Sequence, residues 1–316
     1  MINSALRMFL RELVDFDGLR PPAALSVDEA LRVYLRDRSS PEAWMLARVV
    51  VPASNLERLV ENPLLRDIRL ACDGQPLPVC VLINSPDPRV DYTLVGRYVY
   101  GERQPIAVRA LDVPIVKAGA ADAGARVHAV VQKLAVAELP YTIPVFLEMP
   151  HDAQLLVGDL LDAIARERRA GRTMLCAAVR CSGPADVVLD CSDVAFFIAT
   201  ARKYEIPIKA NGVQAPLRRT NPQTGLPEHG LLNVFGAAVL SFAFDLDVQE
   251  LTQILLDEKA SNFRLDQESF SWKDHRVNQA AIFNARMSLA RTCSTMRFRE
   301  QADALIALEI LPSLSS

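Results

Sequence analysis

Three charged residues, Glu148, Arg180 and Lys209, each lie at or near the end of a short apolar stretch that is typical of a buried strand. In parallel α/β folds the carboxyl ends of the strands meet at one edge, and ligands bind there. A lone charge is costly to bury. Three charges at equivalent positions therefore predict one cavity in which they neutralise one another. The alternative is an ion-pair network that only ties the strands together.

The three side chains suit different chemical roles. Arg180 can clamp a carboxylate or a phosphate in a bidentate manner. A desolvated Lys209 is predicted to have a lowered pKa and to act as a base or a Schiff-base nucleophile, and Glu148 is predicted to exchange protons. The turns after two of these strands offer backbone N–H groups to an anion. These turns are Ser182-Gly183 and Asn211-Gly212.

Other polar residues extend the candidate site. His229 starts a predicted helix, where the helix dipole favours a neutral imidazole that can polarise a substrate carbonyl; capping of the helix is the alternative. Asn233 lies one turn further on the same face. Cys181, without a positioned histidine, is more typical of a structural thiol. No histidines are paired at i, i+4 and no phosphate-binding glycine motif occurs, so we predict neither a metal nor a cofactor.

Alternating strands and helices must position these residues. Apolar runs predict about six strands, and those after residue 126 alternate regularly with helices. Six strands are fewer than the eight of a complete barrel. The predicted fold is therefore α/β, an incomplete or distorted TIM-like barrel with an N-terminal helical segment. An open doubly wound parallel sheet is the alternative.

The domain organisation is predicted to be simple. We expect one α/β domain over residues 1–316, with 1–46 as an N-terminal helical segment and 262–316 as a C-terminal helical extension. A boundary near 112–125 stays open, because an Ala/Gly-rich stretch interrupts the pattern there. The Pro- and charge-rich segment 85–105 is predicted to be a loop or an edge hairpin.

Composition restricts the partners. A net charge of -3 argues against a protein that depends on nucleic-acid phosphates. No apolar run approaches the length of a membrane span, and the amphipathic start is unlike a signal peptide. Six scattered cysteines suggest free thiols in a reducing compartment. We therefore expect a cytoplasmic protein with a small anionic metabolite as its partner, and a homo-oligomer stays open.

Several segments together resemble an uncharacterised bacterial family of barrel-like α/β proteins. The motifs are Asp15 to Ser26, Trp44-Met-Leu46, Val50 to Ala53, the strand-end Arg180 and Lys209-Ala210, and His229 to Asn233. The family usually has Arg-Thr-Gly-Gly at the arginine turn and a His-His pair where this chain has Gln214-Ala215. The resemblance implies a divergent member whose activity is altered or lost. Two hypotheses follow: an enzyme of lyase or isomerase type, or a non-catalytic ligand-binding or pathway-accessory protein on a degraded barrel.

Overall fold

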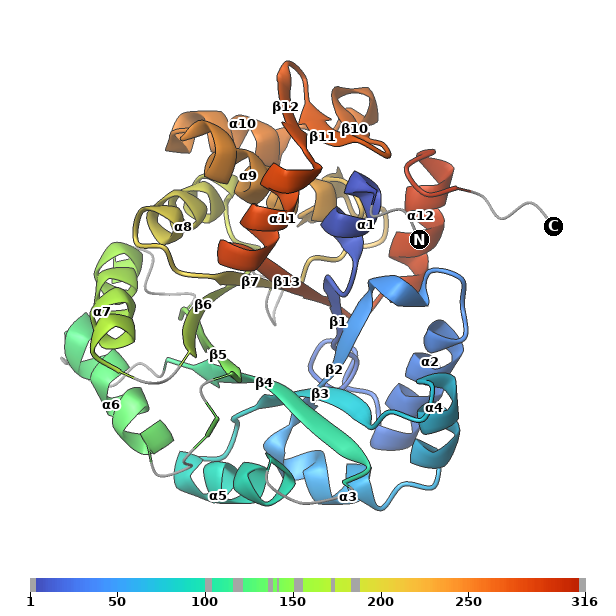
Figure 1. The fold of residues 1–316 in the computed structure, drawn as a ribbon, viewed down its shortest axis with the longest axis vertical. Coiled ribbons are helices and arrows are strands. Elements are labelled where there is room, and N and C mark those ends of the chain that lie inside the picture. Colours follow the sequence, from blue (N-terminus) through green and yellow to red (C-terminus); the bar gives the residue numbers. More distant parts are fainter. Residues whose placement is uncertain are drawn as a thin grey trace. The chain divides into compact units, whose positions relative to one another are not determined.

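Eight strands form a closed parallel α/β barrel of TIM-like type in the computed structural model (Figure 1). The structure describes residues 4–99, 104–115, 122–135, 139–140, 142–150, 156–171, 174–182 and 188–312. The strand order is β1-β13-β7-β6-β5-β4-β3-β2. The strands are β1 Val14–Phe16, β2 Leu46–Pro52, β3 Leu77–Leu82, β4 Ile106–Pro114, β5 Pro144–Glu148, β6 Met174–Arg180, β7 Ile208–Asn211 and β13 Ala290–Thr295. The TIM-like prediction is confirmed, and the open sheet is excluded.

Two strands that the apolar pattern does not predict complete this barrel. β1 has only three residues, which is too short to show an alternation of apolar and polar side chains. β13 is polar in sequence yet largely buried. The hydroxyl of Thr292 donates to the carbonyl oxygen of Leu13 at 2.8 Å, and such a bond lets a polar side chain lie in the interior. The predicted incompleteness of the barrel is therefore wrong.

The chain forms two compact units. Unit 1 comprises Met1–Val14 and Val179–Ser316, and unit 2 comprises Asp15–Ala178. In the described part of the chain, no helix is long and apolar enough to cross a membrane.

Unit 2 contains the parallel run from β2 to β5 together with most of β6. Residues paired across these strands point to the same side, so every second residue of each strand joins one core. That core is built from mostly small side chains, namely Val50, Cys80, Ala110, Phe146, Cys176 and Ala178. The helices lie outside this run of strands (Figure 1). They are α2 Val27–Arg38, α3 Leu56–Val60, α4 Leu65–Ala71, α5 Pro88–Val99, α6 Ala123–Ala135 and α7 Val157–Ala170, with 3-10 turns at Ala43–Met45 and Ala53–Asn55.

Helix α5 lies within the segment that is predicted to be a loop or an edge hairpin, so that prediction is wrong. Pro88 occupies the first helical position, where a missing N–H costs nothing and the fixed φ suits a helix. Asp91 also stabilises the start of this helix. Its buried carboxylate accepts hydrogen bonds from the backbone N–H groups of Asn84 and Ser85 at 2.8 and 2.9 Å.

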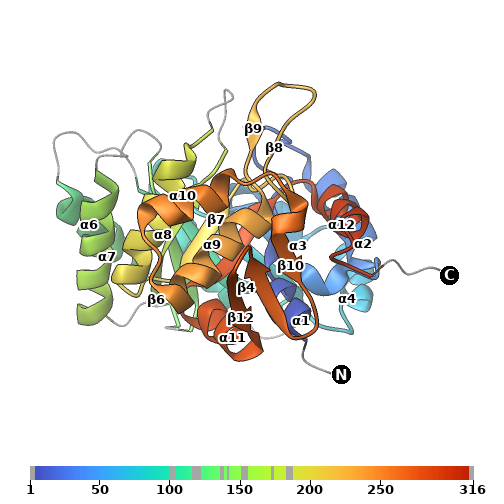
Figure 2. The ribbon, with the colours of Figure 1, turned by 90° about the horizontal axis from the view of Figure 1, so that it is seen from above.

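Unit 1 brings the first residues of the chain together with its C-terminal part. β7 and β13 pair in parallel, with Lys209 opposite Thr292. A hairpin of β8 Arg219–Thr220 and β9 Pro227–Glu228 follows β7, and Figure 2 shows it on the side opposite to α1 and α11. A small antiparallel sheet is formed by β10 Phe263–Leu265, β11 Ser269–Trp272 and β12 His275–Asn278. The helices are α1 Ala5–Leu10, α8 Cys191–Lys203, α9 Leu231–Phe244, α10 Val248–Leu256, α11 Gln279–Ser288 and α12 Phe298–Ala307, with a 3-10 turn at Ala260–Asn262.

Candidate functional site

β6 and β7 carry the two cations that the sequence singles out: Arg180 ends β6, whereas Lys209 is the second of the four residues of β7 and not its last. The backbone N–H of Cys181 donates to the carbonyl oxygen of Asn211 at 2.8 Å, which ties the two strand ends together. Arg180 is the last residue of β6 and is half-buried. Lys209 and Asn211 on β7 are both fully buried, with 0% of each residue exposed. Arg180, Lys209 and Asn211 therefore lie on adjacent strands of unit 1.

The turn after β7 is held by the strands on both sides. The hydroxyl of Ser182 donates to the carbonyl oxygen of Gly212 at 2.8 Å. The N–H of Gly212 donates to the carbonyl oxygen of Ser294 at 3.1 Å, so this N–H is engaged rather than open to an anion. Gly212 has a φ of +75°, which favours glycine. Gly183, the other glycine predicted for anion binding, lies outside the described residues.

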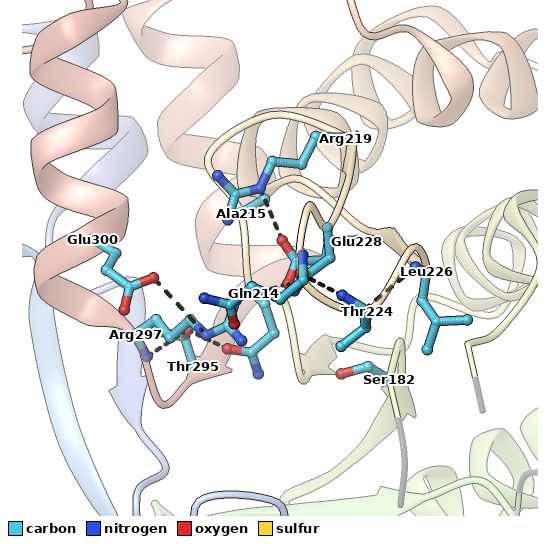
Figure 3. Close-up of polar contacts among 12 residues, drawn as sticks. Ser182, Gln214, Ala215, Arg219, Thr224, Leu226, Glu228, Thr295, Arg297 and Glu300 are labelled. Carbon is cyan, nitrogen blue, oxygen red and sulfur yellow. Dashed lines mark hydrogen bonds and ion pairs between the residues drawn. The ribbon is translucent and has the colours of Figure 1, made fainter. Parts of the chain in front are cut away.

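Above these strand ends, Glu228 joins the β8–β9 hairpin to the start of α12 (Figure 3). Its carboxylate accepts from Arg219 Nε at 2.8 Å, Asn221 Nδ2 at 2.7 Å and Arg297 Nη1 at 2.8 Å. Burial alone would raise the pKa of Glu228, but the hydrogen bonds from Arg219 and Asn221 outweigh it and the pKa is lowered. The sequence analysis does not predict this cluster, because Arg297 lies 69 residues beyond Glu228 in the chain.

A second contact joins the loop that follows β7 to the last residue of β13. The hydroxyl of Thr295 donates to Oε1 of Gln214 at 3.0 Å (Figure 3). Gln214 is the first residue at the position where the resembled family has its histidine pair. In this chain the Gln214 amide links the loop after β7 to the end of β13.

His229 makes contacts that favour a structural role, and its predicted catalytic role stays untested. The ring is 2% exposed, and Nε2 donates to the carbonyl oxygen of Leu189 at 2.7 Å. Nδ1 lies 4.0 Å from Sγ of Cys191. The same sulfur accepts a hydrogen bond from Arg218 Nη1 at 3.1 Å. Burial lowers the pKa of His229, and the hydrogen bond to Leu189 opposes this only in part. The imidazole is therefore neutral, and both of its nitrogens face the protein interior.

Asn233 likewise connects backbone segments. Its Oδ1 accepts from the N–H of Arg218 at 2.7 Å, and its Nδ2 donates to the carbonyl oxygens of Ile254 and Asp257, each at 2.8 Å. All these partners are main-chain groups. The contacts favour a role in fixing the loop before α9 rather than the predicted role in binding substrate.

The cysteines of this region are buried thiols. Burial raises the pKa of Cys181 to about 12 and that of Cys191 to about 11. A thiol with such a pKa holds its proton at neutral pH and is a poor nucleophile. The structural interpretation of Cys181 is therefore the better supported one.

In unit 2, Glu148 lies at the end of β5 beside an arginine that the sequence analysis does not single out. Nη1 of Arg20 lies 3.6 Å from Oε2 of Glu148, whose side chain is 13% exposed. Asp17 holds the same guanidinium: Nε of Arg20 donates to its two carboxylate oxygens at 2.9 and 2.8 Å, and Nη2 donates as well. Asp17 and Arg20 belong to the loop after β1, within the first motif of the family resemblance.

Unit 2 contains a second buried ion pair. Arg48 on β2 donates from Nε and Nη2 to the carboxylate of Asp15 at 2.7 and 3.1 Å, and its guanidinium carbon lies 6.0 Å from the ring centroid of Phe146. Burial lowers the pKa of both Arg20 and Arg48, but nearby carboxylates, including the fully buried Asp112, outweigh it and raise both. Both guanidiniums therefore stay charged at every accessible pH.

The predicted site residues thus divide between the two units. Glu148 lies in unit 2, whereas Arg180 and Lys209 lie in unit 1, so their convergence on one cavity stays a prediction. Among the described residues, no cluster of three or more His, Cys, Asp or Glu side chains is arranged to hold a metal ion. The closed barrel defines a TIM-like α/β protein. No protein-family model matches the chain, and no curated protein matches it either.

Proposed function

We propose that this barrel is an enzyme that acts on a small anionic metabolite, with Lys209 as its reactive amine and Arg180 as the group that binds the carboxylate or phosphate. The observation that carries the proposal is the complete burial of Lys209 on β7, beside the strand that ends in Arg180. A buried ammonium group is costly. Desolvated lysines serve enzymes as bases and as Schiff-base nucleophiles.

Two related chemistries fit this arrangement, namely carbon–carbon lyase or isomerase chemistry and simple proton transfer. In the first, the neutral amine of Lys209 adds to a substrate carbonyl carbon, one proton is taken up and water leaves, which forms an iminium. The iminium accepts the electron pair from a neighbouring C–H or C–C bond when that bond breaks, which gives an enamine and releases a proton or a carbonyl fragment. Protonation of the enamine carbon restores the iminium, and hydrolysis then restores the amine. In the second, Lys209 removes a proton next to a carbonyl and forms no covalent bond.

Reductive trapping distinguishes the two. The protein is incubated with pyruvate, a small keto acid, and then with sodium borohydride, and the modified peptides are identified by mass spectrometry. Schiff-base chemistry predicts a reduced adduct on Lys209 that is absent from Lys209→Met and weaker in Arg180→Gln. The exposed Lys203 and Lys259 report the background reaction of ordinary lysines.

Proton transfer has its own measurement. Exchange of the pyruvate methyl protons in deuterated water is followed by NMR, and we expect Lys209→Met to abolish any exchange that the protein catalyses. Circular dichroism verifies that the variant is folded. Adducts on exposed lysines alone, together with no catalysed exchange, would refute Lys209 as the reactive group for this substrate class.

The second candidate is a non-catalytic ligand-binding or pathway-accessory protein. It is favoured by the contacts of His229 and Asn233, which engage main-chain groups and a buried thiol, and by Gln214-Ala215, which stands where the resembled family has a histidine pair. Membership of that uncharacterised bacterial family is part of this proposal. An anion that raises the melting temperature but is never converted would favour this function over the first.

A further inference from the structure

One nitrogen of Arg20 in unit 2 lacks a hydrogen-bond partner. Arg20 is 6% exposed, and Nε and Nη2 are both engaged by Asp17. In the part of the chain that the structure describes, the buried Nη1 makes no hydrogen bond, and Oε2 of Glu148 lies 3.6 Å away. Buried donors are nearly always satisfied, and leaving one unsatisfied is costly. A buried donor without a hydrogen-bond partner among the described residues, next to the partly exposed Glu148 carboxylate, indicates a place for a ligand atom.

The loop that carries Arg20 fixes the direction of this donor. The carbonyl oxygen of Gly18 accepts from the N–H of Leu25 at 2.9 Å, and that of Arg20 accepts from the N–H of Ala24 at 2.9 Å. A Cβ on Gly18 would lie 2.6 Å from the ring of Phe16, so the loop packs closely on β1. The grip of Asp17 prevents rotation of the guanidinium. A side chain held in this way loses little conformational entropy when its N–H donates to a ligand.

The surrounding charges decide what kind of group fits. Asp17, Glu148 and Asp112 all act on the Arg20 guanidinium and raise its pKa. A further anion would be repelled by these three carboxylates. A neutral oxygen meets no such repulsion: a carbonyl accepts from Nη1, and a hydroxyl both accepts from Nη1 and donates to Glu148.

We propose that Arg20 and Glu148 form a subsite for a hydroxyl or carbonyl group of a small polar ligand. Nη1 of Arg20 donates to the ligand oxygen, and the Glu148 carboxylate accepts the hydroxyl proton where one is present. The subsite goes beyond the function proposed above, because it stands on unit 2 alone and requires neither Lys209 nor turnover.

Arginine side-chain NMR tests the subsite directly. Protein labelled with ¹⁵N-arginine is titrated with hydroxyacetone, a neutral hydroxy ketone, and separately with acetate, an anion. The Arg20 signals are assigned by their loss in Arg20→Lys. We expect saturable shifts of the Arg20 signals with hydroxyacetone and weaker shifts with acetate, while the Arg48 signals stay unchanged.

Two variants make the test specific. Glu148→Gln keeps the shape of the side chain but removes its charge, and we expect it to weaken hydroxyacetone binding about tenfold. Arg48→Lys disturbs an equally buried arginine–aspartate pair and is expected to leave binding unchanged. Tighter binding of acetate, unshifted Arg20 signals, or equal losses in both variants would overturn the subsite. Trapping on Lys209 and titration of Arg20 are measured on different residues, so either proposal can fail alone.

Discussion

Substitution of Gly212 by alanine tests whether the turn after β7 is as tightly packed as the structure shows. An added Cβ would collide with Oγ of Ser182 and lie 2.9 Å from the carbonyl oxygen of the same residue. The backbone φ of +75° would also be strained for alanine. Gly225 is a matched control, because its φ is +70° but nothing lies within 4 Å of its added Cβ.

The expected change in the free energy of unfolding has three contributions. The left-handed backbone costs an L-residue about 1–2 kcal/mol, and alanine recovers about 0.4–1 kcal/mol through the unfolded chain. These two contributions, from the backbone and from the unfolded chain, apply to Gly212→Ala and to Gly225→Ala alike. Overpacking adds about 1–3 kcal/mol at Gly212 only. We therefore expect Gly212→Ala to lower the free energy of unfolding by about 1–3 kcal/mol more than Gly225→Ala does.

Urea denaturation followed by circular dichroism measures both variants. Ser182→Ala in the Gly212→Ala background removes the colliding hydroxyl and leaves the carbonyl oxygen in place, so we expect a partial recovery of stability. Equal losses for the two glycine variants would refute the packing argument. Ser182→Ala alone measures the cost of losing the hydrogen bond to Gly212. An equal cost of Ser182→Ala in the wild-type protein and in the Gly212→Ala background would show that the collision with the hydroxyl does not cause the loss.

Three further predictions follow from the described groups. All six cysteines are buried, and the raised pKa of Cys181 and Cys191 keeps both protonated, so a thiol reagent at neutral pH should modify the folded protein much more slowly than the urea-unfolded protein. Glu228 has a pKa below its ordinary 4.5, so its stabilisation is complete above pH 4.5 and is lost as the pH falls through the folded-state value; the deficit of Glu228→Gln in urea melts, about 1–3 kcal/mol at neutral pH, should shrink in acid, and a constant deficit would contradict the charge argument. His229 is neutral with a pKa below 6.5, so wild-type stability should decline as the pH falls below 6.5, and His229→Gln should flatten that part of the stability curve.

The barrel class follows from the sequence because most of its strands are apolar runs separated by amphipathic helices. β13 escapes prediction because Arg291, Thr292 and Ser294 make it look like a polar segment, and only its partners in the fold show why it is buried. Helix α5 escapes because proline and charged residues usually indicate a loop, whereas Pro88 lies at the one helical turn that tolerates it.

The candidate site is predictable to a similar extent. Arg180 and Lys209 lie on the adjacent strands β6 and β7, as the spacing of apolar runs indicates, but Lys209 lies within its strand rather than at the end. The hydrogen bonds from His229 to Leu189 and from Arg20 to Asp17 depend on loop conformations. The periodicity of apolar residues does not predict such bonds. The local sequence pattern therefore locates a strand, but it does not show which side chains already form hydrogen bonds within the protein.

The make-up of unit 1 has a consequence for synthesis on the ribosome. Leu13 pairs with a residue 279 positions later in the chain, whereas unit 2 is continuous from Asp15 to Ala178. At roughly 5–20 residues per second, about 14–56 seconds separate the emergence of Leu13 from that of its partner. During that interval all the residues of unit 2 have been made, but the first strand of the barrel still lacks β13, one of its two neighbours. Closure of the barrel must therefore follow the synthesis of β13.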